Sequence, residues 1–188
     1  MKKKIALLDL GGVVFQSTGV SNKIIDWKTI SKLNNIYGHD LNIGKDLFAT
    51  FLNDYNTITS QNLTGTTFLT AVFDTLEINS ALIDGIGEHF EIVIVSDNYK
   101  ENIEYIAQRY HFEKWSTRQI YSFDYQMEKA NPLFFSRLLK ETGYSTDDLV
   151  FIDDSPKKLE SAKKNGIKGI LFSNNEQVKL DLRNANYF

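Results

Sequence analysis

Short apolar runs, each followed by a longer segment of helical character, recur along the whole chain. Such runs predict strands, and their alternation with helices predicts a parallel sheet covered by helices on both faces. Residues 4–8 lead directly into Asp9. Residues 150–152 lead in the same way into Asp153 and Asp154. We therefore expect an α/β fold, a three-layer doubly wound parallel sheet, in which these two strand ends meet at one edge.

Carboxylates that share one sheet edge need a counter-charge. An ionised Asp is costly in an apolar setting unless it is paired, hydrogen-bonded or bound to a cation. Three such charges a few ångströms apart repel one another by roughly 1 to 4 kcal/mol per pair. Between the two acidic strand ends, Ser96 closes the apolar run 92–95, and Lys129 precedes Asn131-Pro132. The four segments together would bring carboxylates, a hydroxyl and an ammonium group to one site.

These four segments resemble, in order, the four motifs of the haloacid dehalogenase (HAD) superfamily. Residues 8–14, Leu-Asp-Leu-Gly-Gly-Val-Val, look like the first motif. Residues 95–98, Val-Ser-Asp-Asn, look like the second, and residues 128–135, Glu-Lys-Ala-Asn-Pro-Leu-Phe-Phe, are similar to the third. Residues 151–155, Phe-Ile-Asp-Asp-Ser, resemble the acidic fourth motif. The resemblance covers the whole chain and points to subfamily I, the branch with a small helical cap after the first strand.

The resemblance implies a division of roles within the site. Asp9 is expected to be the nucleophile, and Lys129 is expected to neutralise the nucleophile and the phosphate. The expected substrate-binding residues are Leu10, Gly11, Ser96, Asp97, Asn98 and Lys129. The expected ligands of Mg²⁺, which prefers carboxylate and carbonyl oxygens, are Asp9, the backbone carbonyl of Gly11, Asp153 and Asp154. For Asp153 two roles stay open, a second metal ligand or a group that orients Lys129.

These roles imply a magnesium-dependent phosphatase that acts on a small phosphorylated metabolite, such as a sugar phosphate, through an aspartyl-phosphate intermediate. Gly11 departs from the family pattern. Phosphatases of this superfamily usually carry a second Asp there, two residues after the nucleophile, as general acid and base. Three possibilities then remain open for the leaving group. A cap side chain or a metal-bound water could donate the proton, or the leaving group could be one that needs no protonation.

Other functions stay open beside the phosphatase. The chain could be a weak or inactive HAD-like domain that binds metal and phosphate for regulation. In a dehalogenase-type hydrolase, Asp9 would attack a carbon atom of the substrate. Such an enzyme needs no magnesium, so it would not be expected to keep the acidic pair Asp153 and Asp154. A receiver domain has its acidic pair before the phosphorylated Asp, which is the opposite order. A phosphonate hydrolase would need a cap lysine for a Schiff base, and the candidates are Lys23, Lys28, Lys32 and Lys45.

Composition narrows the partners. The 188 residues carry a net charge of −3 without a long block of like charge, so we expect neither a nucleic-acid nor a membrane partner. There is no cysteine, which excludes disulfides and cysteine-based zinc sites. Asp9 interrupts the first apolar stretch too early for a signal peptide. We expect a cytoplasmic protein with a small phosphorylated substrate, and composition does not indicate an oligomeric state.

Residues 18–76 differ from the rest of the chain in composition. They are rich in Asn, Thr and Asp, and their apolar side chains recur at helical spacing. They are expected to form the helical cap, and residues 1–17 and 77–188 the α/β core. Residues 24–37 are expected to form one amphipathic helix or two, residues 47–55 another, and residues 66–76 one more.

Three local expectations concern glycine and proline. Gly11 and Gly12 are expected to allow backbone angles or close approaches that a side chain would forbid. Residues 13–15 are expected to continue into a small hairpin. A helix should begin at Pro132, with Asn131 as its N-cap, and should stop at Gly143.

Overall fold

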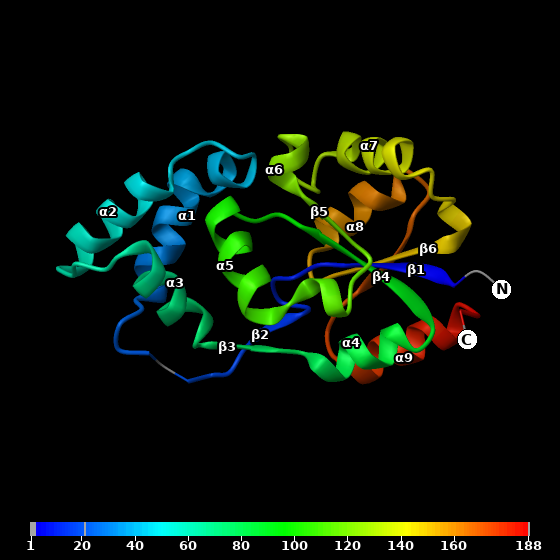
Figure 1. Cartoon of the computed structure of the whole chain (residues 1–188). Coiled ribbons are helices and arrows are strands. Elements are labelled where there is room, and N and C mark those ends of the chain that lie inside the picture. The colour runs from blue at the N-terminus through cyan, green and yellow to red at the C-terminus, as the bar shows by residue number, and fades with distance from the viewer. Residues whose placement is uncertain (1–2, 21, 188) are drawn as a thin grey trace.

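A five-stranded parallel sheet forms the centre of the computed structural model, which describes residues 3–20 and 22–187. The strand order is β5-β4-β1-β6-β7. The strands are β1 (Lys4–Leu8), β4 (Phe90–Ser96), β5 (Arg118–Tyr121), β6 (Leu149–Asp153) and β7 (Lys168–Leu171). The parallel sheet, flanked by helices, confirms the predicted α/β fold (Figure 1).

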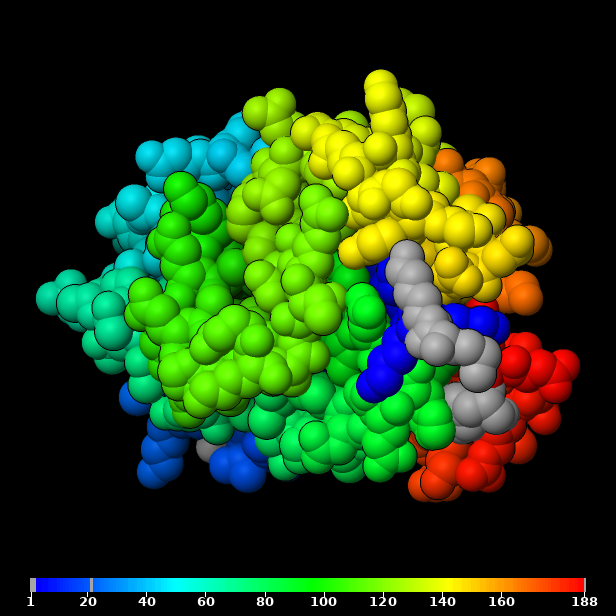
Figure 2. Space-filling view, turned by 45° about the vertical axis from the view of Figure 1, so that its right-hand side comes forward, coloured from blue at the N-terminus to red at the C-terminus, as the bar shows by residue number. Residues whose placement is uncertain are grey.

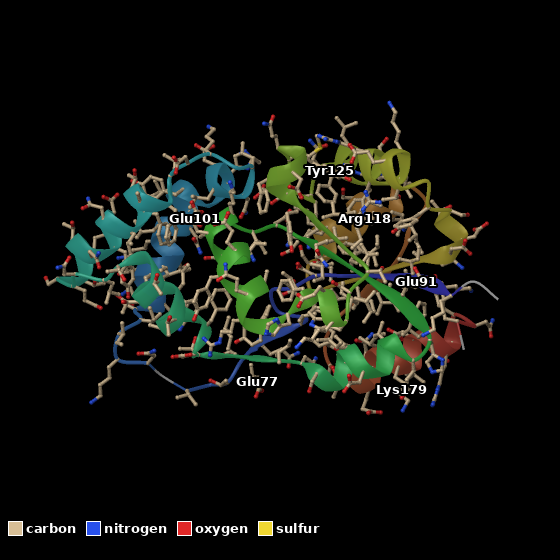
Figure 3. The ribbon with its side chains drawn as sticks, viewed as in Figure 1. Glu77, Glu91, Glu101, Arg118, Tyr125 and Lys179 are labelled. Atoms are coloured by element: carbon tan, nitrogen blue, oxygen red, sulfur yellow. The ribbon has the colours of Figure 1, made fainter. Side chains whose placement is uncertain are left out.

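Helices cover both faces of this sheet. They are α4 (Ser80–Gly87), α5 (Lys100–Tyr110), α6 (Ser122–Tyr125), α7 (Pro132–Thr142), α8 (Pro156–Lys163) and α9 (Asn175–Asn184). Successive side chains of a strand point to opposite faces. Ile5 and Leu7 accordingly pack with α7 and α8, whereas Ala6 and Leu8 belong to the cluster that contains α4, α5 and α9. Figure 3 shows side chains filling both layers, with Lys179 on the α9 side.

The ends of α7 follow the predicted local chemistry. The side chain of Asn131 accepts the N–H of Leu133 at 3.1 Å, and Pro132 occupies the first turn, where no N–H donor is needed. Gly143 ends the helix with a φ of 68°, in the left-handed region. The loop immediately before α7 carries Lys129, two residues from the N-cap.

A helical segment, residues 27–73, lies between two short strands outside the main sheet. It consists of α1 (Trp27–Asn42), α2 (Phe48–Thr59) and α3 (Gly65–Phe73). The flanking strands β2 (Phe15–Ser17) and β3 (Leu76–Ile78) pair with each other in antiparallel fashion. Figures 1 and 2 show the segment (blue to teal) at the opposite end of the molecule from the start of β1. It therefore stands at the end of the sheet where the carboxyl ends of the strands lie.

Two local predictions in this region are wrong. Residues 13–15 do not form a local hairpin, because Phe15 pairs with Ile78, far along the chain. The third helix ends at Phe73 instead of Leu76, since Leu76 already belongs to β3. In both cases a distant pairing partner decided what the local pattern could not. Among residues 3–20 and 22–187 there is no helix with the length and apolar character needed to cross a membrane.

Candidate active site

Three of the predicted side chains meet at the carboxyl edge of the sheet. β1 is the central strand, with β4 on one side and β6 on the other. Asp9 follows β1, Ser96 is the last residue of β4, and Asp153 is the last residue of β6. The chain builds the sheet outward on both sides of β1, and ligands of open α/β sheets bind where the strand order reverses in this way.

Lys129 ties this edge together. Its Nζ lies 2.7 Å from Asp9 Oδ1 and 2.7 Å from Asp153 Oδ2, and it donates to the carbonyl oxygen of Val95 at 3.0 Å. The Lys129 side chain is fully buried. The backbone N–H of Lys129 donates to Asp97 Oδ1 at 2.8 Å. The structure thus brings all four sequence segments into contact.

A second cation, Lys158, was not predicted from the sequence. It lies in the first turn of α8, and its Nζ is 3.5 Å from Asp9 Oδ2 and 3.4 Å from Asp97 Oδ2. Sequence alone offers a weak signal for it, because Lys157, Lys163 and Lys164 are equally plausible on the same stretch. Only the packing of α8 against the sheet distinguishes Lys158 from its neighbours.

The two lysines set the ionisation of the buried carboxylates. Burial raises the pKa of Asp9, but Lys129 and Lys158 lower it by more, so the Asp9 pKa lies below its ordinary value. Burial raises the pKa of Asp153 to about 6, against the opposing effect of Lys129 and with a further contribution from Asp9. Burial lowers the pKa of Lys158, but the nearby carboxylates raise it by more. Asp9 is therefore a carboxylate at neutral pH.

The carboxylates also form a group that suits a hard cation. One oxygen from each of Asp9, Asp153 and Asp154 lies within 4.8 Å of the others. With Asp97, four carboxylates face two ammonium groups, and the excess of two negative charges matches a dication. Asp154 is exposed and stands open toward solvent. Oxygen donors and this charge are what Mg²⁺ requires, so the residues present fit the predicted metal.

The two glycines of the first motif differ in what they contribute. Gly12 has a φ of 74°, and a Cβ there would lie 2.3 Å from Asp154 Oδ2, so only glycine lets that carboxylate approach. Gly11 has no left-handed φ, and a Cβ there would meet no atom within 4 Å. The prediction of a conformational need for glycine is therefore right for Gly12 and wrong for Gly11. A side chain at position 11 would be accommodated.

The remaining predicted substrate-binding residues lie in different settings. The backbone N–H of Leu10, which is predicted to bind a phosphate oxygen, donates to Asp9 Oδ1 at 2.8 Å in this structure. Ser96 Oγ is buried and has no hydrogen-bond partner in the described structure. Asn98 Oδ1 accepts from the N–H of Tyr99 at 2.9 Å and from Asn102 Nδ2 at 3.0 Å.

A polar cavity of about 500 Å³ opens over Asp9. From the sheet edge it is lined by Asp9, Gly11, Asp97, Asn98, Glu128, Asp154 and Lys158. From α1 and the start of α5 it is lined by Asn34, Gly38, His39, Asn42, Tyr99 and Asn102. Sequence reasoning missed the α1 residues, although Asn34, Gly38 and Asn42 recur at four-residue spacing, which places them on one helix face. Two larger hollows lie away from the carboxylates, against α8 and α9 and between α4 and α9.

Hydrogen bonds hold α1 over this cavity. The hydroxyl of Tyr99 donates to Asn34 Oδ1. Glu128 Oε1 accepts from Asn42 Nδ2 at 2.8 Å, and Glu128 Oε2 lies 3.1 Å from His39 Nδ1. The helical segment 27–73 is thus connected to the sheet edge through side chains that line the cavity itself.

Comparison with known proteins gives a consistent assignment. Residues 22–172 match the family model described as haloacid dehalogenase-like hydrolase. No curated protein matches the chain at a significant level. A HAD family enzyme from Bacteroides thetaiotaomicron, solved in complex with magnesium and inorganic phosphate, superposes with a TM-score of 0.68 at 18% identity, over 91% of this chain and 94% of that one.

Two further solved structures share the fold. A HAD-superfamily hydrolase from Ehrlichia chaffeensis gives a TM-score of 0.59 at 19% identity, over 98% of both chains. A 2-haloacid dehalogenase from Pseudomonas syringae gives 0.55 at 14% identity, over 92% of this chain and 86% of that one. These identities show the fold alone. Since the family model spans most of the sequence, and the motif residues meet at one sheet edge, the chain belongs to the haloacid dehalogenase-like hydrolase family.

Proposed function

We propose that the protein is a magnesium-dependent phosphatase that acts on a small phosphorylated metabolite through an aspartyl-phosphate intermediate. The observation that carries the proposal is an ionised Asp9 that lies between Lys129 and Lys158 and lines a polar cavity whose carboxylates match the charge of a dication. The Bacteroides relative, which was solved with magnesium and inorganic phosphate, supports both the metal and the ligand.

Asp9 is arranged to attack with one particular oxygen. Its Oδ1 accepts from the Leu10 N–H at 2.8 Å and lies 2.7 Å from Lys129 Nζ, so that oxygen is held. The ion pair of Oδ2 with Lys158 Nζ, at 3.5 Å, is longer than either contact of Oδ1. We assign Oδ2 as the atom that bonds to phosphorus, after which water releases the phosphate. Mg²⁺ bound by Asp9, the Gly11 carbonyl and Asp154 would act as a Lewis acid on the phosphoryl group.

The site offers positive charge and one hydroxyl to the phosphoryl group. Lys158 lines the cavity beside the nucleophile, and Lys129, whose three donors are directed at Asp9, Asp153 and Val95, adds positive charge. Ser96 Oγ, buried without a partner, would gain the hydrogen bond that it lacks, and an unsatisfied buried hydroxyl costs about 1–3 kcal/mol. Asp97 is negatively charged and suits a different task, since it holds Lys158 and the backbone of Lys129 in place.

The outer part of the cavity favours a leaving group that carries hydroxyls. Amide side chains line it, and each can donate and accept hydrogen bonds to a polyol: Asn34, Asn42, Asn98 and Asn102. We infer that the substrate is a sugar phosphate or a similar metabolite and that residues 18–76 act as a cap over a core of 1–17 and 77–188. A cytoplasmic location, as expected from the sequence, stays a prediction.

The alternatives receive less support. The four lysines considered for a Schiff base, Lys23, Lys28, Lys32 and Lys45, are all described, and none lines the cavity. A dehalogenase would need neither the Asp154 carboxylate nor Gly12, the glycine that lets this carboxylate approach. A regulatory domain that binds without turnover is separated from an enzyme by the assay below.

The test is turnover and binding by the purified protein. Para-nitrophenyl phosphate and a panel of phosphorylated sugars are assayed with magnesium and with chelator, and phosphate and magnesium binding are measured by calorimetry. We expect metal-dependent release of phosphate that Asp9→Asn abolishes, with Asp147→Asn, an exposed carboxylate in the turn before β6, as the matched control. Binding without turnover supports the regulatory domain, and chelator-resistant halide release from 2-haloacids would identify a dehalogenase.

A further inference from the structure

Glu128 joins two side chains of α1 to the loop that carries Lys129. Its carboxylate lies 3.1 Å from His39 Nδ1 through Oε2 and accepts from Asn42 Nδ2 at 2.8 Å through Oε1. His39, Asn42 and Glu128 all line the cavity that also contains Asp9 and Gly11. An imidazole therefore faces the same space as the nucleophile and the position from which the usual general acid is missing.

The contact with Glu128 decides which ring nitrogen can serve the cavity. A carboxylate on Nδ1 fixes the N–H on that atom and orients the ring, and Nε2 is then the atom left for a ligand. His111 makes a similar pair with Glu113 at 3.2 Å, but neither residue lines the cavity. Of the three histidines, all within the described residues, His39 is the one placed with the nucleophile.

The direction of the reaction also points to α1. In a displacement at phosphorus the attacking and leaving oxygens lie roughly in line, on opposite sides of the phosphoryl group. Asp9 approaches from the sheet edge, so the leaving oxygen faces away from the sheet. The residues that line that side of the cavity come from α1 and the start of α5, and His39 is the imidazole among them, the side chain that most often serves as general acid and base.

We propose that His39, oriented by Glu128, is the general acid and base that Gly11 cannot supply, which rests on the phosphatase function proposed above. In the first step the Asp9 Oδ2–phosphorus bond forms, the bond from phosphorus to the leaving oxygen breaks, and the imidazolium gives its Nε2 proton to that oxygen. In the second step the water oxygen bonds to phosphorus and gives a proton to the neutral Nε2, while the Asp9 Oδ2–phosphorus bond breaks and phosphate leaves. The imidazolium and the free carboxylate are then restored.

The test compares two leaving groups in matched variants. An alkyl phosphate such as glycerol phosphate needs a protonated leaving oxygen, whereas para-nitrophenyl phosphate hardly does. His39→Asn should lower alkyl phosphate turnover by about 100- to 10,000-fold and aryl phosphate turnover only a few-fold. His111→Asn, which removes a histidine–carboxylate pair that does not line the cavity, should change neither. Glu128→Gln, which leaves His39 without its carboxylate partner, should follow His39→Asn with a smaller loss.

A rescue separates chemistry from structure. Gly11→Asp places the missing acid directly after the nucleophile, where a Cβ meets no atom within 4 Å. In the His39→Asn background, Gly11→Asp should raise alkyl phosphate turnover at least tenfold relative to His39→Asn alone. Equal losses for both substrates in His39→Asn, no loss, or a wild-type protein that hydrolyses only the aryl phosphate would overturn the role of His39. A wild type that hydrolyses neither substrate would instead overturn the phosphatase function.

Discussion

Replacing Lys129 with Met removes one buried cation from between two carboxylates. Lys129 Nζ lies 2.7 Å from both Asp9 Oδ1 and Asp153 Oδ2 and donates to the carbonyl of Val95. Methionine keeps an unbranched apolar stem of similar length, so the packing of that stem is largely preserved. The substitution therefore tests the charge and its hydrogen bonds, with little effect from a cavity.

The structure allows the magnitude to be worked out. Removing one partner of a buried ion pair costs about 3–5 kcal/mol, because the other charge is left uncompensated. Asp153, whose pKa burial raises to about 6 even beside Lys129, relieves part of this cost by taking up a proton. We therefore expect the free energy of unfolding to fall by about 3 kcal/mol near neutral pH in the absence of metal.

The same reasoning fixes a pH dependence. A carboxyl group with a raised native pKa makes the native state bind more protons than the unfolded chain, so stability falls as the pH rises through that pKa. Lys129→Met should raise the pKa of both neighbouring carboxyls, since the lysine lowers the pKa of Asp9 and opposes the increase at Asp153 in the wild type. The loss of stability should therefore be smaller at about pH 5 than at about pH 8.

The assay is urea unfolding in the presence of a chelator, followed by circular dichroism. The matched control is Lys100→Met, because Lys100 is an exposed residue whose Nζ lies 4.0 Å from Glu104, and its loss should change stability by at most about 0.5 kcal/mol. Addition of magnesium should recover part of the Lys129→Met loss by restoring positive charge. A decrease in the free energy of unfolding of less than about 1 kcal/mol at neutral pH would refute the reasoning, since removing one partner of a fully buried ion pair should cost more than that.

Three further predictions concern the same site. Gly12→Ala should weaken magnesium binding in calorimetry at least tenfold, because its Cβ would displace Asp154, whereas Gly11→Ala should not; equal effects would contradict the geometry. In the His39→Asn background, Gly11→Asp should raise alkyl phosphate turnover more than aryl phosphate turnover, and a uniform change would count against an acid at position 11. Lys158→Gln should weaken binding of inorganic phosphate by about 10- to 100-fold, as expected for one charged hydrogen bond of about 1.5–3 kcal/mol. Unchanged affinity would remove Lys158 from the phosphate site.

Much of the fold and part of the site could be predicted from the sequence. A strand that is buried on both faces requires a continuous apolar run, so the runs before Asp9 and Asp153 identify β1 and β6 directly. In a parallel sheet their carboxyl ends share one edge, which brings the acidic residues together without knowledge of any other contact. The helix from Pro132 to Gly143 was equally local, because its cap residues act on their own backbone.

Only the tertiary structure decided the features that depend on distant partners. The pairing of Phe15 with Ile78 replaced the expected hairpin, since a strand takes its hydrogen bonds from whichever backbone the fold brings beside it. The selection of Lys158 from several lysines required the packing of α8 beside Asp9. His39 and Glu128 lie 89 positions apart, and nothing in either local pattern links them. The sequence by itself determined which strands end in acidic residues, because an apolar run and the acidic residues that follow it are adjacent in the chain. The partners of those charges depended on how the helices pack around the sheet.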